Sequence, residues 1–175
     1  MSKKLKQLIS DTQAQFKADA KSAKATFESS SRLQDGLRSE VTLRQHSLTV
    51  DEPAALGGTD KGPNPVELIL ASLGSCQEIT YRAYATALDI PLENVSVKID
   101  GDIDLRGFFG VDDSVRAGYE AVRGTVHLES SASEEQLELL RNAVNAHCPV
   151  LDILRNPVPV ELNLKIDQPA IEAAA

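Results

Sequence analysis

The sequence predicts an α+β fold in which antiparallel strands precede and follow one long buried helix. The first observation is a mostly apolar run from Pro65 to about Leu88, which starts with helix-capping residues and has no internal proline. The second is a series of segments on both sides of this run in which apolar and polar residues alternate, as in strands with one solvent-exposed face. Because these segments do not alternate regularly with helices, the order differs from the βαβ repeats of a nucleotide-binding fold.

Length and composition are those of one domain with an appendage. The chain has 175 residues, of which 42% are hydrophobic and 25% are charged, so it can bury a core. Its formal net charge of -8 has the wrong sign for phosphate-backbone binding, and we expect no nucleic-acid partner. No apolar run approaches the roughly 20 residues of a membrane span, and the N-terminus lacks the apolar core of a secretory signal. We therefore expect a cytoplasmic protein with no membrane partner.

Residues 2–24 have the spacing of one amphipathic helix outside the main domain. Apolar side chains recur on one face from Leu5 to Ala23, and no glycine or proline interrupts them. Because an isolated helix of this kind is marginally stable, we expect it to dock on the body or on a second subunit. The main domain is then predicted to span residues 25–167, and residues 168–175 form a frayed tail.

Alternating residues between positions 25 and 50 predict two or three strands. We expect Phe27 in a short first strand, followed by a turn at residues 34–36, where the sequence is Gln-Asp-Gly. The alternation changes phase near residues 45–46, which indicates a bulge or the start of another strand.

A loop rich in glycine and proline leads into the long helix. Asn64 is a strong N-cap residue, Pro65 suits the first helical position, and Glu67 completes a capping box. Glycines before a helix N-terminus are compatible with anion binding, but the Gly-Lys-Ser/Thr ending of a P-loop is absent. Pro63 and Pro65 also remove two amide donors. We interpret the loop as a device that sets the entry of the helix.

The elements after the long helix complete the predicted fold. A second capping box, formed by Ser133 and Gln136, marks the start of one of them. In chain order we expect strands over residues 95–105 and 121–129 joined by a long loop, a helix to about residue 146, a short helix from Cys148-Pro149, and a last strand over residues 158–166.

The two cysteines are the residues best able to carry chemistry. Two are too few for a disulfide scaffold, and without CxxC or HxxxH a structural zinc site has little support. Cys76 lies on an apolar face of small residues, which is typical of a buried structural thiol with a raised pKa. Cys148 falls at the N-cap of the last short helix, where amide dipoles favour a thiolate, and His147 beside it could add positive charge. If the sulfurs meet, a disulfide closes a loop of about 73 residues and contributes roughly 4 kcal/mol in the chain-entropy model.

The segment GGTDKGPNPVELILASLGSC, with Cys76 in the long helix and Cys148-Pro149 opening a late one, resembles the OsmC/Ohr family. The similarity is greatest to an OsmC-like branch with a DEPxxLGGTDxGPNPxE segment, and it covers about residues 25–166, leaving the N-terminal helix outside. It implies an OsmC-like fold built as an intertwined homodimer. In that fold two long central helices pack together, and sheets from both chains wrap around them.

The resemblance also implies a function, because characterised members of the family are thiol peroxidases. They reduce organic hydroperoxides and, less efficiently, hydrogen peroxide. Carried over, Cys76 is the peroxidatic nucleophile that becomes a sulfenic acid, and Cys148 is the resolving thiol that condenses with it to a disulfide. A dithiol, a lipoylated protein in the Ohr branch, then restores both thiols. No metal or bound cofactor is needed, and the apolar face around Cys76 suits an alkyl or lipid peroxide.

A nucleophilic thiolate in an apolar pocket needs a positive partner. The family supplies an arginine from its N-terminal strands, held by a glutamate near the start of the long helix. Arg32 is the best positional equivalent of that arginine. Two further arginines compete with it: Arg38 and Arg44. The family glutamate directly follows the Asn-Pro pair, where this chain has Val66, whereas Glu67 comes one residue later and by helix phase points away from Cys76.

Two other interpretations of the same fold stay open. In one, suggested by Val66, the protein does not turn over peroxide: its dimer pocket holds an apolar ligand or a reactive-sulfur species, and the cysteines act as a sensor. In the other, it is a structural or stress-associated protein with inert cysteines.

Overall fold

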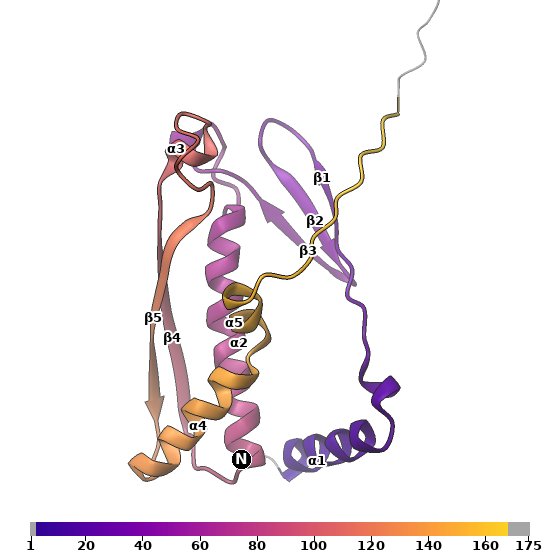
Figure 1. Ribbon diagram of the computed structural model, residues 1–175, viewed down its shortest axis with the longest axis vertical. Helices are drawn as coiled ribbons and strands as arrows, with labels where there is room; N and C mark the ends of the chain where they lie inside the picture. The colour runs from indigo at the N-terminus through magenta and orange to yellow at the C-terminus, as the bar shows by residue number, and fades with distance from the viewer. Residues whose placement is uncertain (1–2, 168–175) are drawn as a thin grey trace, which may run out of the picture.

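The structure, a computed structural model, describes residues 3–167 and confirms the α+β class. Residues 168–175, expected to form a frayed tail, lie outside the described residues. The long helix α2 (Pro65–Ala87) runs through the molecule, and the antiparallel pair β4 (Asn94–Ile103) and β5 (Tyr119–Glu129) packs along one side of it (Figure 1). Helices α4 (Glu134–His147) and α5 (Pro149–Arg155) pack against α2 as well.

Helix α2 begins where the sequence predicts it. The Asn64 side chain accepts a hydrogen bond from the Glu67 backbone N–H at 2.8 Å, and the Glu67 carboxylate accepts one from the Asn64 N–H at 2.8 Å. Pro65 occupies the first turn, where a missing N–H costs nothing. The C-terminal half of α2 supplies part of the core, which forms where this helix, α4 and the hairpin meet. The buried core residues are Tyr81, Ala85, Ile90, Leu92, Leu140 and Val144.

A second sheet contains the first three strands of the chain. It joins β1 (Ser30–Leu33), β2 (Ser39–Leu43) and β3 (His46–Val50) in antiparallel order. The predicted phase change is a two-residue turn between β2 and β3, with Arg44 in a left-handed conformation at φ 56°. The expectation that Phe27 belongs to the first strand is wrong, because β1 starts three residues later and the Phe27 side chain is exposed.

The N-terminal segment folds as two pieces rather than as the single helix expected over residues 2–24. Helix α1 (Lys3–Ala18) ends before Asp19, whose extended backbone (φ -141°) breaks the helical path. The Asp19 side chain then accepts a hydrogen bond from the Lys21 N–H at 2.9 Å and caps the 3₁₀ turn η1 (Ala20–Ala23). Helix α1 docks on the body, where Lys6 forms an ion pair with Asp89 just beyond the end of α2.

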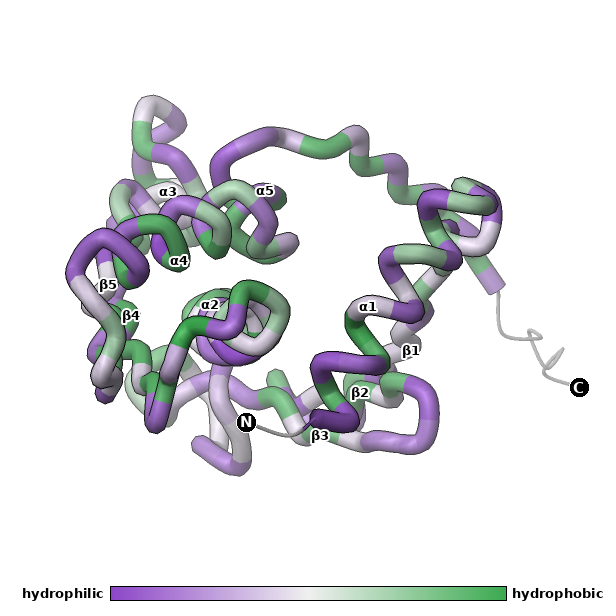
Figure 2. Tube along the Cα trace, turned by 90° about the horizontal axis from the view of Figure 1, so that it is seen from below, coloured by the Kyte–Doolittle hydropathy of each residue, from purple (hydrophilic) through white to green (hydrophobic). Residues whose placement is uncertain are grey.

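The strand predicted over residues 158–166 does not form in this chain. The segment is extended but unpaired, because neither sheet of the described residues offers it a neighbouring strand. It leaves α5 and runs away from α2 (Figure 1), and more and less hydrophobic residues alternate along it (Figure 2). Its apolar side chains are exposed. The exposed apolar residues are Val158, Val160, Leu162, Leu164 and Ile166.

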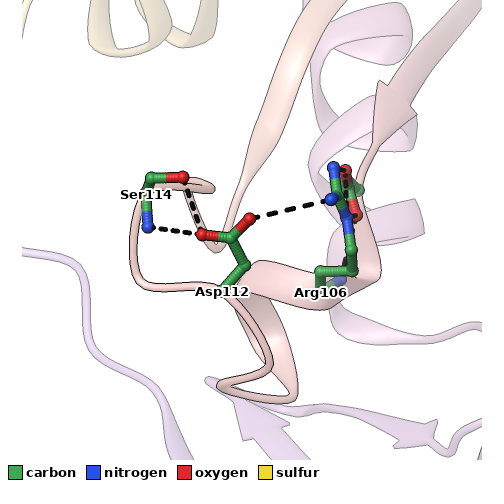
Figure 3. Close-up of polar contacts among 4 residues, drawn as sticks. Arg106, Asp112 and Ser114 are labelled. Atoms are coloured by element: carbon green, nitrogen blue, oxygen red, sulfur yellow. Dashed lines mark hydrogen bonds and ion pairs between the residues drawn. The ribbon is translucent and has the colours of Figure 1, made fainter.

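The connection between β4 and β5 is folded, although the sequence predicts only a loop. It opens with the short helix α3 (Leu105–Phe108), which Asp104 caps by accepting from the Arg106 N–H at 3.0 Å. Figure 3 shows Asp112 accepting from the N–H and hydroxyl of Ser114 at 3.0 and 2.6 Å, with its other oxygen 3.7 Å from the Arg106 guanidinium. The Ser114 hydrogen bonds lower the pKa of Asp112. No helix among residues 3–167 is long and apolar enough to cross a membrane.

Candidate active site

The two cysteines are brought together by elements that lie far apart in the sequence. Cys76 lies in the middle of α2, and Cys148 occupies the junction of α4 and α5. The Cys148 N–H donates to the Val144 carbonyl at 2.9 Å, ending α4, and its carbonyl accepts from the Asp152 N–H at 3.0 Å, starting α5. The Cys148 thiol donates to the Cys76 sulfur across 3.3 Å. Both thiols are reduced, so the pair is a dithiol within reach of a disulfide.

Burial is the main influence on the pKa of the Cys76 thiol. Cys148 is 1% exposed, whereas Cys76 is partly accessible. Burial raises the pKa of the Cys76 thiol, while the Val150 backbone N–H, and more weakly Thr80, act in the opposite direction. The adjacent Cys148 raises the pKa further. No cation from the described part of the chain offsets this effect, so Cys76 needs a positive charge from elsewhere to be an effective nucleophile at neutral pH.

The structure does not bring Arg32 to the cysteines within one chain. Arg32 is exposed on β1, and the three-stranded sheet stands apart from the middle of α2 (Figure 1). Arg44 is exposed in the turn between β2 and β3. Arg38 is half-buried, and its Nε has no hydrogen-bond partner in the described residues.

Glu67 does not lie beside the cysteines either. Its carboxylate closes the capping box with Asn64, nine residues before Cys76. At 1.5 Å per residue this corresponds to about 13 Å along the helix axis. The structure therefore assigns Glu67 a role in starting α2.

Sequence reasoning missed the role of Asp51, which organises the loop before α2. This buried carboxylate accepts hydrogen bonds from the backbone N–H groups of Glu52, Thr59 and Lys61 and from the Thr59 hydroxyl at 2.6 Å. The Thr59 hydroxyl is the main cause of its lowered pKa. The signal was present in the DEP and TD residues of the loop, since an acidic side chain among glycines often binds its own backbone.

A glycine in this loop is required for close backbone packing. A Cβ on Gly58 would lie 1.8 Å from the Glu52 carbonyl oxygen, so no other residue fits without a shift of the chain. Together with Asp51, this contact fixes the path of the loop into α2. The interpretation that the loop sets the helix entry agrees with this geometry.

One cysteine lies within a long helix, and the second lies at the start of a later helix. A known protein family includes this part of the chain. The family described as OsmC-like protein matches residues 58–163, which include both cysteines. The chain belongs to the OsmC-like family. None of the curated proteins compared matches this OsmC-like chain.

Solved structures share the fold of this OsmC-like protein. An OsmC-like protein from Mycoplasma pneumoniae has a TM-score of 0.65 at 19% identity, and the match covers 76% of this chain and 89% of that one. An organic hydroperoxide resistance protein OsmC from Legionella pneumophila has a TM-score of 0.59 at 21% identity, covering 75% and 90%. An organic hydroperoxide resistance protein from Elizabethkingia anophelis, crystallised with thiocyanate bound, has a TM-score of 0.59 at 17% identity, covering 77% and 91%.

Proposed function

We propose that this OsmC-like protein is a thiol peroxidase that reduces organic hydroperoxides, and hydrogen peroxide less efficiently. The observation that carries the proposal is the 3.3 Å approach of the Cys148 thiol to Cys76. A dithiol held at this distance can pass through a sulfenic acid to a disulfide without a large rearrangement. Family membership and the fold shared with hydroperoxide resistance proteins support the same chemistry.

The reaction balances with the two thiols, one peroxide and one external dithiol. The Cys76 thiolate attacks the terminal peroxide oxygen, the O–O bond breaks, and the alkoxide takes a proton to leave as an alcohol. The resulting Cys76 sulfenic acid then condenses with Cys148, which releases water and forms the disulfide. A dithiol such as a lipoylated protein exchanges with this disulfide, restores both thiols and becomes oxidised itself. No step draws on a metal or a bound cofactor.

The active unit in this proposal is a homodimer. The exposed apolar residues Ile69 and Ile79 on α2, and the unpaired segment 158–166, are surfaces that a second copy would cover. The three-stranded sheet carries Arg32 away from the body of its own chain, toward where a second chain would lie. Arg32 of one copy then stabilises the Cys76 thiolate of the other, which supplies the cation that a single chain lacks.

A redox sensor without turnover is the second candidate. It is favoured by the engagement of Glu67 in the capping box, which leaves the arginine without the carboxylate that holds it in the family. A sensor would form the Cys76–Cys148 disulfide once and would not be recycled rapidly by any dithiol.

Consumption of tert-butyl hydroperoxide, with lipoamide or thioredoxin as reductant, separates these functions. A peroxidase consumes many equivalents of peroxide with one of the reductants, and Cys76→Ser abolishes this consumption. Ser75→Ala, at the neighbouring exposed position on α2, is the matched control and leaves the rate unchanged. Peroxide consumption that stops after about one equivalent with both reductants identifies a sensor, and equal turnover by Cys76→Ser removes the proposal altogether.

A further inference from the structure

Two adjoining cavities lie between α2, α5 and the β4–β5 hairpin, and neither is lined by Cys76 or Cys148. Their volumes are about 390 and 200 Å³. Because four residues line both cavities, the two adjoin, and we call them together the α5 groove. The shared residues are Leu73, Val122, Leu151 and Arg155. Its size is in the range of small-molecule sites, and it is separate from the thiol pair.

A buried amide in this groove lacks a partner. Gln77, adjacent in sequence to Cys76, is 5% exposed and lines the groove, yet its Nε2 has no hydrogen-bond acceptor among the described residues. A buried donor without an acceptor destabilises the protein, and each such group in a folded chain needs an explanation. An acceptor on a bound ligand would satisfy it.

The charges lining the groove favour an anionic ligand. Arg155 lines both cavities and Arg116 the larger one, and neither forms an ion pair within residues 3–167. Arg123 also lines the groove, but Asp100 and Asp102 neutralise it. Glu120, in the larger cavity with Arg116, offsets one of the two remaining positive charges. With Asp100, Asp102 and Glu120 counted, the charges around the groove cancel, and Arg155 is the cation without an ion-pair partner that is common to both cavities.

Aliphatic side chains make up about half of the walls of the groove. Leucine and valine side chains from α2, α5 and β5 surround the space beside Arg155, and further aliphatic residues from the hairpin extend it past Gln77. These residues are Leu73, Val97, Ile99, Val122, Val126, Leu151 and Leu154. An unpaired amide donor and a free guanidinium beside such walls match a ligand with one carboxylate and one aliphatic chain.

We propose that the α5 groove binds an amphipathic carboxylate, such as a medium-chain fatty acid. The carboxylate accepts a hydrogen bond from Gln77 Nε2 and pairs with Arg155, and the chain lies along Leu73, Val122 and Leu151. This site does not depend on the thiol chemistry. The ligand would contact α2 at Gln77, next to Cys76, and α5 at Leu151, about one turn after Cys148. It would therefore lie near the two cysteines without contacting either of them.

Calorimetric titration of the full-length chain with decanoate tests the proposal, and methyl NMR of Leu73 and Leu151 locates the site. We expect saturable binding with shifts confined to the groove, in wild type and in Cys76→Ser alike. Gln77→Leu and Arg155→Gln each weaken binding about tenfold or more, because each removes a hydrogen bond to a charged group. Decanol binds more weakly than decanoate by a similar factor. Lys98→Gln, which removes an exposed charge on β4 outside the groove, leaves the affinity unchanged.

Several outcomes would overturn the proposal. Absence of saturable decanoate binding, or shifts elsewhere in the molecule, rejects the site. Equal affinity for decanol rejects recognition of the carboxylate, and equal weakening by Lys98→Gln shows a general charge effect instead. Thermal unfolding of each variant shows whether it is folded, so that a loss of decanoate affinity is distinguished from a loss of structure. Since the readout is binding, loss of peroxidase activity would not affect the result.

Discussion

The Cys148 thiol approaches the Cys76 sulfur to 3.3 Å although 72 positions separate the two residues in the chain. A disulfide requires about 2.05 Å, so the sulfurs need to move only a little closer than they already lie. The approach depends on the junction of α4 and α5, because Pro149 cannot continue α4 and suits the first position of α5, which begins directly after Cys148.

Oxidation with one equivalent of peroxide is therefore expected to give an intramolecular Cys76–Cys148 disulfide. Mass spectrometry of unreduced peptides should show the linked pair and the loss of two hydrogens. The closed loop of about 73 residues should raise the free energy of unfolding by roughly 4 kcal/mol relative to the reduced protein. Urea unfolding before and after oxidation measures this gain. A similar gain in Cys148→Ser would contradict the assignment, because that variant cannot form the bond.

The pH dependence of Cys76 reactivity tests the proposed role of Arg32. Burial raises the pKa of Cys76 within one chain, so without a cation its thiolate becomes abundant only above the pH range of an ordinary cysteine. A guanidinium from a second copy lowers that pKa. In a Cys148→Ser background, we expect Arg32→Gln to move the pH profile of Cys76 alkylation to higher pH and to slow alkylation at neutral pH about tenfold or more.

The competing arginines provide the controls for this experiment. Arg44→Gln removes an equally exposed charge from the next turn, and Arg38→Gln removes the half-buried guanidinium with the unpaired Nε. Both should leave the profile in place. If the pH profile of Cys76 alkylation shifts in one of these variants but not in Arg32→Gln, the arginine replaced in that variant is the one that stabilises the Cys76 thiolate.

Asp51 should make stability depend on pH in the acidic range. Its pKa is lowered in the folded state, chiefly by the Thr59 hydroxyl, so the folded protein binds this proton less readily than the unfolded chain. The stabilisation is present above the unfolded value of about 4 and is lost as the pH falls through the lower folded value. We expect Asp51→Asn to lower the melting temperature at pH 7, and this difference from wild type to shrink below pH 4.

The other acidic residues with lowered pKa values are common to both proteins, so they cancel in the comparison. They are Asp102, Asp104 and Asp112. A difference in melting temperature between wild type and Asp51→Asn that stayed constant from pH 7 to pH 3 would show that the carboxylate charge does not contribute. Thr59→Val, which removes the strongest partner of Asp51, should reduce the same pH dependence.

Local signals in the sequence predicted much of this fold. The capping residues Asn64 and Ser133 fixed the starts of α2 and α4, and Cys148-Pro149 marked the start of α5. The proximity of the cysteines followed only from the family resemblance, because no local pattern relates positions 76 and 148. Asp51 was missed because its partners Thr59 and Lys61 lie eight and ten residues ahead in a loop, where hydrophobic periodicity gives no information.

Two further expectations depend on contacts that a single chain does not contain. Residues 158–166 have the alternation of a strand, which predicts that the apolar face of the segment is covered. In the described chain, no strand pairs with this segment and its apolar side chains stay exposed. The position of Arg32 is a similar case, since its place on β1 relative to Cys76 depends on what lies against the three-stranded sheet. In both cases we propose that a second copy of the chain supplies the missing neighbour.

The apolar residues of the segment 158–166 should therefore be needed for dimerisation. Leu162 is 91% exposed in the single chain and lies at the centre of a run of exposed apolar residues, which is typical of an interaction surface. Leu162→Lys places a charge on the face that a second copy would bury, and we expect the protein to become monomeric at micromolar concentration. Asn163→Lys adds the same charge at the next position, on the opposite face of an extended segment, and should leave the dimer intact. Sedimentation equilibrium distinguishes the two. Equal dissociation by both variants would contradict a partner-covered strand, and a wild-type protein that sediments as a monomer would also contradict the supply of Arg32 from a second copy.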